Sequence, residues 1–443
     1  MTEGGASGPH VVILGGGLAG VAAAHRLGDE GVAVTLVDRN DYQQFQPLLY
    51  QVATSQLPAE DIARPHRAIF HDHPTVEVRT SEVTEIDPSG HSLTLSTGET
   101  VSGSHLVIAA GAKPEFFGVP GAAEHAFPLY SVSDAERLRR HLQLLLETDP
   151  ASDEDVLHVV VVGGGPTGVE TSGAVGELMA ALASVDTPGT LGHVTLVDRG
   201  NAVLGAFSAK SQKYAAKRLG DRGVDLRLGA GVASVHADHL ELDDGTRIDT
   251  RTVVWGGGES AAAVVQDAGL ATGRGGRLDS RPDLTLDGHP RVYAIGDAAN
   301  TPGGANGRTL PQLGSVAQQS GRWAADNILR ELRGKEPLPF AYKDKGIMAM
   351  IGRNAAVAEV GKKRHQVEGP VAFAAWLGVH AMLLSGAHSK ADAFLSWGWD
   401  YFDRDHAAIL ESSSTPKRIA WDDETADRPT IVVDRTDAAT SRT

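Results

Sequence analysis

Cysteine is the residue type that this chain lacks altogether: none occurs among its 443 residues. Disulfides, thiolate metal sites and iron–sulfur clusters are therefore excluded. The same absence excludes any mechanism that passes electrons through a redox-active cysteine pair.

Positive charge and long apolar runs are also scarce. The formal net charge is −16, and no Lys/Arg-rich stripe breaks the acidic balance, so nucleic acid is not an expected partner. No stretch of the sequence reaches the roughly 20 apolar residues of a spanning helix. The first ten residues, MTEGGASGPH, contain no apolar signal region, so we expect a cytoplasmic protein. A chain of this length can form two or three domains.

What the sequence does contain is one glycine-rich motif in two copies. His10–Gly20 reads HVVILGGGLAG, and His158–Gly168 reads HVVVVGGGPTG. Each copy is followed by VTLVDR, a strand that ends at Asp38 in the first case and at Asp198 in the second. One such motif is a weak signal and can reflect tight packing alone. Two copies in matched strand–turn–helix–strand settings predict two bound dinucleotides.

Each glycine of the motif has a predicted task. The first permits the tight turn after the strand, the second lets a pyrophosphate approach the backbone, and the third lets the helix pack on the strand. The helix N-terminus then faces the phosphates, and the strand-end aspartate accepts hydrogen bonds from ribose. The glycines are Gly15, Gly17 and Gly20 in the first copy and Gly163, Gly165 and Gly168 in the second.

Apolar periodicity predicts an α/β fold with two Rossmann-like dinucleotide-binding domains and a C-terminal α+β region. Strands are expected over 76–79, 92–95, 105–110, 252–255 and 290–300, helices over 133–147 and 311–332, and a strand pair over 340–360. Two apolar, tryptophan-bearing segments follow at 371–384 and 391–402. Residues 1–9, the acidic break at 152–155 and the polar tail 411–443 are expected to be disordered or connecting.

Two further motifs place the chain in a superfamily. AAGA at Ala109–Ala112 and AIGDAA at Ala294–Ala299, in this order around the two glycine motifs, resemble the glutathione-reductase-like flavoproteins with two dinucleotide-binding domains. The resemblance implies that the first motif binds FAD, the second binds NADH or NADPH, and Asp297 bonds the FAD ribitol. It also implies an FAD domain over 10–121 and 275–335, an NADH domain over 122–274 and a C-terminal domain over 336–410.

Three segments resemble a narrower family, the type II NADH dehydrogenases, which are single-subunit NADH:quinone oxidoreductases that pump no protons. They are FQPLLYQVA at Phe45–Ala53, VVGGGPTGVE at Val161–Glu170 and YKDKGIMAMIGR at Tyr342–Arg353. In that family the first segment lies along the flavin. The motifs and the resemblance together indicate as further cofactor-binding residues Arg39, Gln46, Pro47, Leu48, Val83, Ala110, Gly111 and Gly257.

The same resemblance implies two catalytic residues. Glu170 matches a family glutamate near the nicotinamide and the flavin, where a charge tunes electron transfer and proton supply. Its alternative is an ordinary carboxylate in the first turns of a helix. Lys345 matches a family lysine near flavin and quinone, and its alternative is a solvated lysine in a polar turn.

The quinone site shows a departure from the family. Members often carry A-Q-x-A-x-Q, whereas residues 314–319 read GSVAQQ, which keeps Gln319 and replaces the first glutamine by Ser315. Serine reaches less far than an amide, so the match to the family is weaker at the quinone head group. Met348 is expected to form an apolar wall of this pocket, or to fill the core.

The nicotinamide is predicted to be NADH rather than NADPH. The Asp198 carboxylate repels a 2′-phosphate, whereas Arg199 could bind one. Asp38 and Arg39 form the same pair in the first copy, so the arginine does not by itself indicate NADPH.

The C-terminal segments predict membrane contact. Phe373, Trp376, Leu377, Leu383 and Leu384 fall near one helical face, Phe394, Trp397 and Tyr401 near another, and Lys362, Lys363 and Arg364 precede them. Aromatic and basic residues suit a membrane surface, so we expect peripheral binding at the inner face of the cell membrane. The alternatives are packing over the flavin domain or a homodimer interface.

Two other functions compete with the quinone reductase. One is a soluble NAD(P)H:acceptor flavoreductase that serves a non-quinone acceptor or a redox protein, and Ser315 with the polar tail favours it. The other is a non-catalytic NADH-binding module that keeps FAD for structure. A sulfide:quinone reductase, related in fold, is excluded because the chain has no cysteine.

Overall fold

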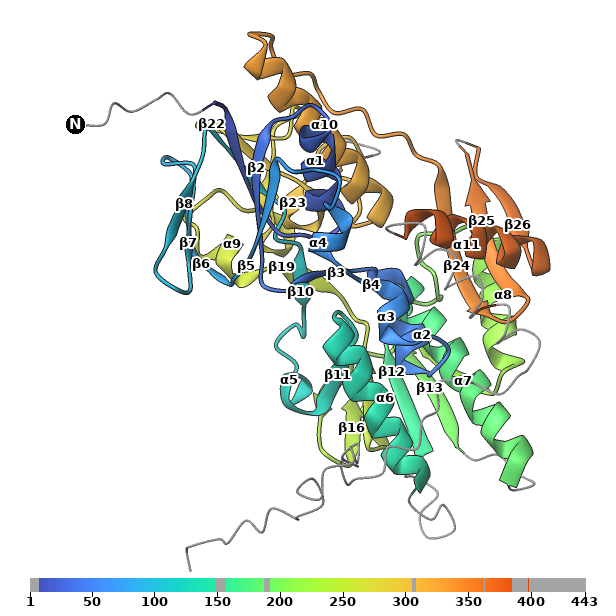
Figure 1. Cartoon of the computed structure of the whole chain (residues 1–443). Helices are drawn as coiled ribbons and strands as arrows, with labels where there is room; N and C mark the ends of the chain where they lie inside the picture. The colour runs from blue at the N-terminus through green and yellow to red at the C-terminus, as the bar shows by residue number, and fades with distance from the viewer. Residues whose placement is uncertain are drawn as a thin grey trace, which may run out of the picture. The chain divides into compact units, whose positions relative to one another are not determined.

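The computed structural model describes residues 8–147, 157–186, 192–304, 308–361, 363–384 and 397. All of them belong to one compact unit, Met1–Ala408 (Figure 1). Several predictions fall on residues outside this description. They concern residues 1–7 at the N-terminus, the segment 152–155, the segment 391–402 apart from Trp397, and the tail 411–443.

The first glycine motif lies in a six-stranded sheet with the order β21-β22-β9-β1-β2-β5. Only the β21–β22 pair in it is antiparallel. Its strands are β1 (His10–Leu14), β2 (Ala33–Asp38), β5 (Val76–Thr80), β9 (His105–Ile108), β21 (Thr285–Leu286) and β22 (His289–Ala294).

Alternate side chains of β1 face two different layers. Val11 and Ile13 pack toward the helices α1 (Leu18–Gly28) and α10 (Gly314–Leu332). Val12 and Leu14 pack toward a three-stranded meander. The meander consists of β6 (Val83–Asp87), β7 (Ser92–Leu95) and β8 (Thr100–Ser102). Because both faces of the strand are buried, it reads as a continuous apolar run.

The second motif repeats this plan in a five-stranded parallel sheet with the order β11-β18-β12-β13-β14. Val159 and Val161 face the helix side, and Val160 and Val162 face a second meander. The sheet contains β11 (Ala126–Pro128), β12 (His158–Val162), β13 (His193–Asp198), β14 (Val224–Leu228) and β18 (Thr252–Trp255). The other elements of this unit are α6 (Val132–Glu147), α7 (Pro166–Asp186), α8 (Ala209–Gly220), β15 (Val232–Val235), β16 (His239–Leu242) and β17 (Arg247–Asp249).

The region built on the first sheet is called the first unit, and the region built on the second sheet is called the second unit. Two antiparallel strands connect them. The chain leaves the first sheet through β10 (Ala112–Pro114) and returns through β19 (Glu259–Ala261), and the two strands pair with each other. After the return, Ala261 and Val265 lie in the core of the first unit, ahead of residue 275, where the sequence places the domain boundary.

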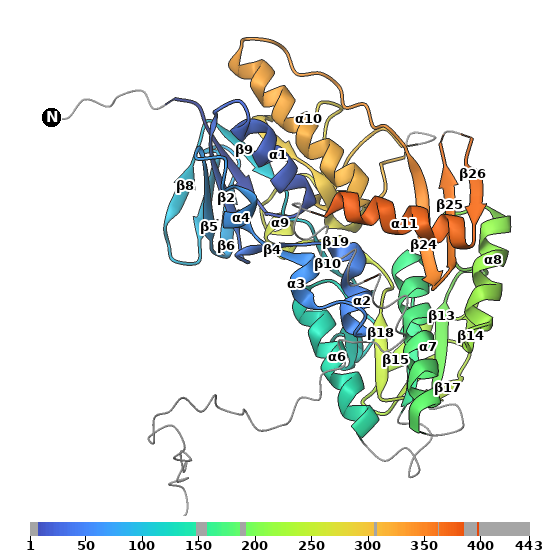
Figure 2. The same cartoon turned by 45° about the vertical axis from the view of Figure 1, so that its right-hand side comes forward.

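The C-terminal region packs on the second unit. Its antiparallel sheet consists of β24 (Gly346–Gly352), β25 (Ala355–Val360) and β26 (His365–Glu368), followed by α11 (Pro370–Leu383). Figure 2 shows this sheet beside α7 and α8. A Cβ at Gly173 of α7 would collide with the backbone carbonyl of Ile351, so glycine there allows β24 to approach the helix.

An insertion between β2 and β5 contains several short elements of the first unit. They are β3 (Tyr42–Gln44), the 3-10 turn η1 (Gln46–Leu48), α2 (Leu49–Ala53), α3 (Ala59–Ile62), β4 (Ala63–Pro65) and α4 (His66–Ile69). Elsewhere the chain forms α5 (Ala122–His125), α9 (Ala263–Gln266), η4 (Arg274–Gly276), β20 (Leu278–Asp279), η5 (Gly296–Ala298) and β23 (Ala299–Asn300).

The predicted strands over 92–95 and 252–255 are confirmed as β7 and β18. The strand expected over 290–300 is shorter, because Gly296 takes a φ of 65° and turns the chain into η5 after β22. Pro311 was expected in the first turn of α10 but precedes the helix, which begins at Gly314. The C-terminal strand pair begins at Gly346 rather than near residue 340.

Candidate active site

The first glycine of each motif makes the same tight turn. Gly15 has a φ of 101° and Gly163 a φ of 113°, a region that side chains rarely adopt. A Cβ on Gly15 would collide with the backbone at Ala109, and one on Gly163 would collide with the backbone at Gly256. Ala110 and Gly257 follow at these points, so each turn abuts the end of the neighbouring strand.

The second and third glycines also behave alike in the two copies. Around Gly17 and Gly165 a Cβ would meet no atom within 4 Å, so the space above both turns is open. A Cβ on Gly20 or Gly168 would collide with the carbonyl of the first glycine of its own turn, which explains why the helix can pack there only without a side chain. The open positions fit the approach of a pyrophosphate to both helix N-termini.

The two strand-end aspartates hold their turns in the same way. Asp38 accepts hydrogen bonds from the amides of Gly16, at 2.5 Å, and Asn40, at 2.7 Å. Asp198 accepts them from Gly164 and Gly200, both at 2.6 Å. A carboxylate has about four lone-pair sites, so each aspartate can still accept a ribose hydroxyl.

The carbonyl of the middle residue in each turn distinguishes the copies. The carbonyl of Gly164 accepts the backbone amide of Leu204 at 2.7 Å. The carbonyl of Gly16 lies 3.0 Å from Nε2 of His66, the first residue of α4, whose side chain is fully buried. The carbonyl can only accept, so Nε2 carries the proton. The sequence contains no motif that indicates this contact.

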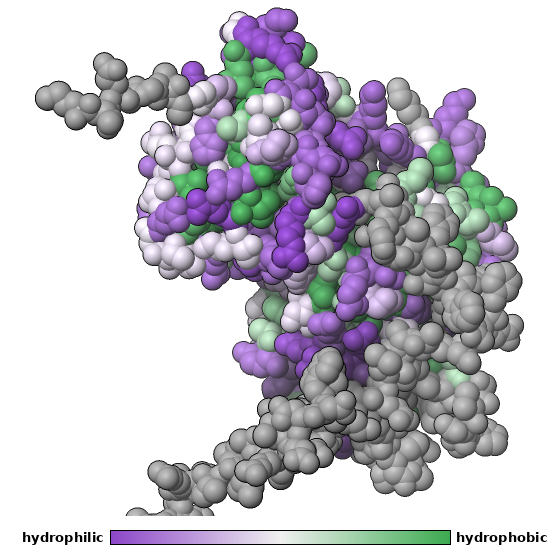
Figure 3. Space-filling view, viewed as in Figure 1, coloured by the Kyte–Doolittle hydropathy of each residue, from purple (hydrophilic) through white to green (hydrophobic). Residues whose placement is uncertain are grey.

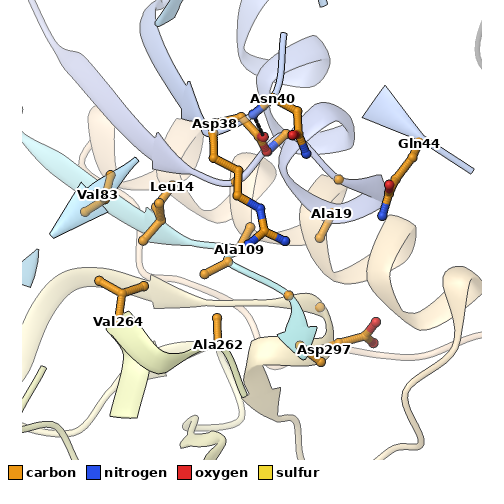
Figure 4. Close-up of a pocket in the computed structure, with 18 of the residues that line it drawn as sticks. Leu14, Ala19, Asp38, Asn40, Gln44, Val83, Ala109, Ala262, Val264 and Asp297 are labelled. Carbon is orange, nitrogen blue, oxygen red and sulfur yellow. Dashed lines mark hydrogen bonds between the residues drawn. The ribbon is translucent and has the colours of Figure 1, made fainter. Parts of the chain in front are cut away.

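A pocket extends from the first turn to η5 (Figure 4). Asp38 and Asn40 lie on one side of it and Asp297 on the other, with Leu14, Val83 and Val264 along an apolar wall. Of the residues predicted to bind the cofactor, those that line it are Gly15, Gly17, Asp38, Arg39, Gln46, Val83, Ala110, Gly111 and Asp297. Pro47 does not line it, and Leu48 is fully buried in the core.

Several lining residues were missed in the sequence. Tyr130 is the most informative, because its hydroxyl accepts the amide of Ala112 at 2.9 Å and its burial holds its pKa above the usual range. Gln44, also in the lining, donates to the backbone carbonyl of Tyr130 at 2.9 Å. Lys113 lies two residues after Gly111, so a longer reading of the AAGA motif could have identified it as a lining residue. No sequence pattern marks Tyr130.

Asp297 is the main acidic group at the far end of the pocket. Burial raises its pKa to about 6, although the nearby Arg277 guanidinium lowers it. The side chain of Gln312, just before α10, reaches the backbone carbonyl of Asp297 at 3.5 Å. Ala317 of α10 lines the same pocket, so the first turns of this helix border it.

Glu170 is buried at the junction of the second unit with the C-terminal region. Its Oε1 accepts two hydrogen bonds, from the amide of Met350 at 3.0 Å and from Nε1 of Trp376 at 3.2 Å. Burial raises the pKa of Glu170 to about 8, and the two hydrogen bonds oppose that rise. The side chain is therefore mostly protonated at neutral pH.

Tyr50 and Gln51 of α2 extend this buried polar cluster. The Tyr50 hydroxyl donates to the Met350 sulfur at 3.2 Å, and the Gln51 amide donates to the Tyr50 oxygen at 3.0 Å. Gln51 also accepts the Nε1 hydrogen of Trp397 at 2.8 Å. The segment Phe45–Ala53 thus contributes to both regions, with Gln46 in the pocket and Tyr50 beside Glu170.

The residues expected at the quinone site are not gathered into this cluster. The Gln319 side chain is held at both ends by the backbone of Lys343, at 2.9 and 3.2 Å, and the Ser315 hydroxyl lies 2.9 Å from that of Tyr342. Lys345 is exposed where β24 begins. Met348 is partly buried and packs in the C-terminal region.

The predicted membrane face of 371–384 needs correction. Trp376 is fully buried, stacks on His380 at 3.8 Å and faces Glu170, while Leu384 is buried as well. Trp397 is also buried. These aromatic side chains form core contacts because Glu170 and Gln51 accept their indole N–H groups.

The opposite face of α11 is apolar and exposed. Val371 is 70% and Met382 69% exposed, with Ala374 and Ala375 exposed between them. Figure 3 shows hydrophobic residues at the surface in the region of α11 and the C-terminal sheet. Within the described ranges, no helix combines the length and the apolar content that crossing a membrane requires.

Comparison with known proteins agrees with this architecture. The family described as pyridine nucleotide-disulphide oxidoreductase matches residues 9–321. A type II NADH:quinone oxidoreductase of Mycobacterium tuberculosis is 35% identical over 87% of this chain and 87% of its own length, and one of Staphylococcus epidermidis is 29% identical over 79% and 89%. The structure of NDH2 from Plasmodium falciparum in complex with NADH has the same fold, with a TM-score of 0.82, 17% identity and coverage of 90% of this chain and 99% of that one. The chain therefore belongs to the type II NADH:quinone oxidoreductase family, within the pyridine nucleotide-disulphide oxidoreductases.

Proposed function

We propose that this protein is an FAD-dependent NADH:quinone oxidoreductase that pumps no protons. The observation that carries the proposal is the pair of open glycine turns, at Gly17 and at Gly165, on one chain. In this assignment FAD binds to residues 10–121 with 275–335, NADH binds to 122–274, and 336–410 form the C-terminal domain. The relatives' names support the acceptor as well as the donor.

The first pocket fits FAD by the groups that line it. The turn at Gly17 and the N-terminus of α1 would receive the pyrophosphate, and Asp38 would receive a ribose. Asp297 and Gln46 also line this pocket and would be available to the ribitol and the ring system. When bound, FAD would supply the redox chemistry, which is hydride acceptance from NADH and two-electron reduction of the acceptor.

The second unit would hold the dinucleotide that supplies the hydride. Gly165 and the N-terminus of α7 would face its pyrophosphate, and Gly257 borders the same turn. The Asp198 carboxylate beside the turn disfavours a 2′-phosphate, which supports NADH over NADPH.

Glu170 is the group best suited to handle a proton. Both N–H donors reach its Oε1, so the proton is left on Oε2. With a pKa of about 8, the acid can release this proton and regain it near neutral pH. We propose that Glu170 takes part in the proton supply of the reaction and that Lys345, exposed where β24 begins, adds positive charge at the acceptor site.

For the quinone we retain Ser315, Gln319 and Met348 as the proposed contacts. Gln319 could offer its amide to a carbonyl of the head group only by releasing Lys343. The exposed face of α11 would bring this region to the inner face of the cell membrane, because an apolar helical face without a partner favours the lipid interface. A second copy of the chain is the competing partner for that face.

Anaerobic mixing tests both halves of the reaction. NADH should bleach the flavin absorbance within the mixing time of a rapid-scanning instrument, and menadione should then restore it. An unbleached flavin would contradict the assignment of NADH as the donor and would favour the non-catalytic binding module. Bleaching without reoxidation by any quinone would contradict the acceptor.

A soluble NAD(P)H:acceptor flavoreductase is the second candidate. The hydrogen bonds of Gln319 with Lys343 and of Ser315 with Tyr342 favour this candidate, because these side chains are then not available to a quinone. Steady-state rates with menadione and with a ferredoxin-type acceptor separate the two functions. A higher kcat/KM for the protein acceptor would identify the flavoreductase.

A further inference from the structure

A hairpin of the second unit carries metal-ligating side chains away from both glycine turns. Residues 236–238 join β15 to β16, and the amide of His236 closes this turn by donating to the carbonyl of His239 at 2.8 Å. Ser234 pairs with Glu241 in the register of these strands. Because side chains alternate along a strand, all four side chains lie on one face of the ribbon.

The potential ligand atoms of this face converge. One atom each from His236, His239 and Glu241 lies within 4.8 Å of the other two. The two imidazole rings are stacked, with centroids 4.3 Å apart and planes 13° from parallel. The Ser234 hydroxyl donates to Glu241 at 3.2 Å and lies 3.0 Å from Nε2 of His236, so it holds these two side chains together.

Asp238 orients one of the imidazoles. Its Oδ1 lies 2.7 Å from Nδ1 of His239, and only 13% of the His239 side chain is exposed. The proton at Nδ1 leaves the lone pair on Nε2. A carboxylate behind a histidine is the arrangement that commonly fixes the tautomer of a metal ligand.

The charge around the cluster favours a cation. Arg247 is the basic side chain beside it, and its guanidinium lies 2.6 Å from Asp249 and 3.8 Å from Asp238. Together with Glu241, these two aspartates supply three carboxylates against one guanidinium. A bound dication would meet an excess of negative charge.

We propose that His236, His239 and Glu241 bind a divalent transition-metal ion such as Zn²⁺, with Asp238 positioning His239. Two imidazoles and a carboxylate form a three-ligand set that leaves a coordination position for water. The ion would hold the hairpin ends together. Since the amide of Val235 donates to the carbonyl of Pro120 at 2.9 Å, it would also steady the segment by which the chain enters this unit.

The test uses the flavin-loaded full chain without an affinity tag, after dialysis against a chelator. Zn²⁺ is titrated in competition with a chromophoric chelator, and thermal unfolding is followed with and without the metal. We expect one Zn²⁺ per chain and a higher Tm when it is bound. Asp238→Asn should weaken binding by about tenfold, and His239→Gln should weaken it further.

His71→Gln is the matched control. His71 also faces a neighbouring carboxylate, Asp72 at 3.0 Å, but it does not belong to the cluster. This variant should bind Zn²⁺ like the wild type. No binding by the wild type at stoichiometric Zn²⁺ would overturn the proposal, as would equal affinities of the wild type and His239→Gln. Glu241→Gln, at an exposed position, gives the same comparison if His239→Gln does not fold.

Discussion

The two glycine turns have the same backbone conformation and differ in the residues that surround them. Both have a positive φ at the first glycine, open space at the second and an aspartate that accepts two amides. In the second copy Glu170 occupies the helical position that Ala22 occupies in the first. The turn geometry is therefore repeated, and the residues around each turn are what make the two proposed sites differ.

The insertion after β2 produces much of this difference. It supplies Gln46 to the first pocket, Tyr50 to the Glu170 cluster and His66 to the carbonyl of Gly16. The second unit has only α8 and its flanking loops between β13 and β14, and there Leu204 secures the turn through its backbone. One inserted segment thus links the predicted flavin pocket with the buried acid.

Substituting the second glycines is expected to give the largest effect. Gly17→Val should abolish FAD retention and activity while the apoprotein stays folded, because the new side chain fills only the space meant for phosphate. Gly165→Val should retain the flavin and raise the KM for NADH by at least about tenfold. Flavin absorbance after gel filtration and steady-state kinetics measure the two outcomes. Equal flavin loss in both variants would contradict the assignment of one nucleotide to each turn.

Glu170→Gln tests the acid that only the second copy carries. Burial raises the pKa of Glu170 from 4.5 to about 8, so the wild type loses stability as pH rises through this window, by up to about 1.4 kcal/mol per pH unit. The glutamine variant does not ionise. Its stability relative to the wild type should therefore rise from about pH 5 to about pH 8, as measured by urea unfolding. A constant difference across this range would show that Glu170 stays charged.

His66 tests the contact that distinguishes the first turn. His66→Phe leaves the buried carbonyl of Gly16 without a donor, which costs about 1–3 kcal/mol, so FAD should bind roughly tenfold more weakly. His66→Gln restores a donor and should recover most of the affinity. The KM for NADH of the flavin-loaded fraction serves as the control and should not change. Equal FAD affinities of the Phe and Gln variants would mean that the shape of the side chain at position 66, rather than its hydrogen bond to Gly16, determines FAD affinity.

The aspartates should give the smallest effect. Asp198→Asn removes the charge that disfavours a 2′-phosphate, so the preference for NADH over NADPH should fall by about tenfold. Asp38→Asn, its counterpart, should leave that preference unchanged. The ratio of kcat/KM for the two nucleotides decides between these outcomes. A change in this ratio caused by Asp38→Asn would mean that the first copy, rather than the second, binds the nicotinamide nucleotide.

Much of the nucleotide-binding architecture could be read from short motifs. A glycine turn and a strand-end acid involve neighbours in sequence, so their geometry follows from local backbone rules. The tryptophans show the limit of such reading. Trp376 and Trp397 look like interfacial residues in the helical pattern, but each finds a buried acceptor on a distant helix.

The sequence by itself therefore determined the two nucleotide turns, their order along the chain and the acid that follows the second turn. These features depend on residue types at fixed local spacing. Only the tertiary structure decided that Met350 and Trp376 donate hydrogen bonds to Glu170. It also decided that His66 donates to the carbonyl of Gly16 and that the side chain of Gln319 is hydrogen-bonded to the backbone of Lys343. Such contacts join segments that are far apart in the chain, and the burial they create sets the pKa of Glu170, which no local pattern reveals.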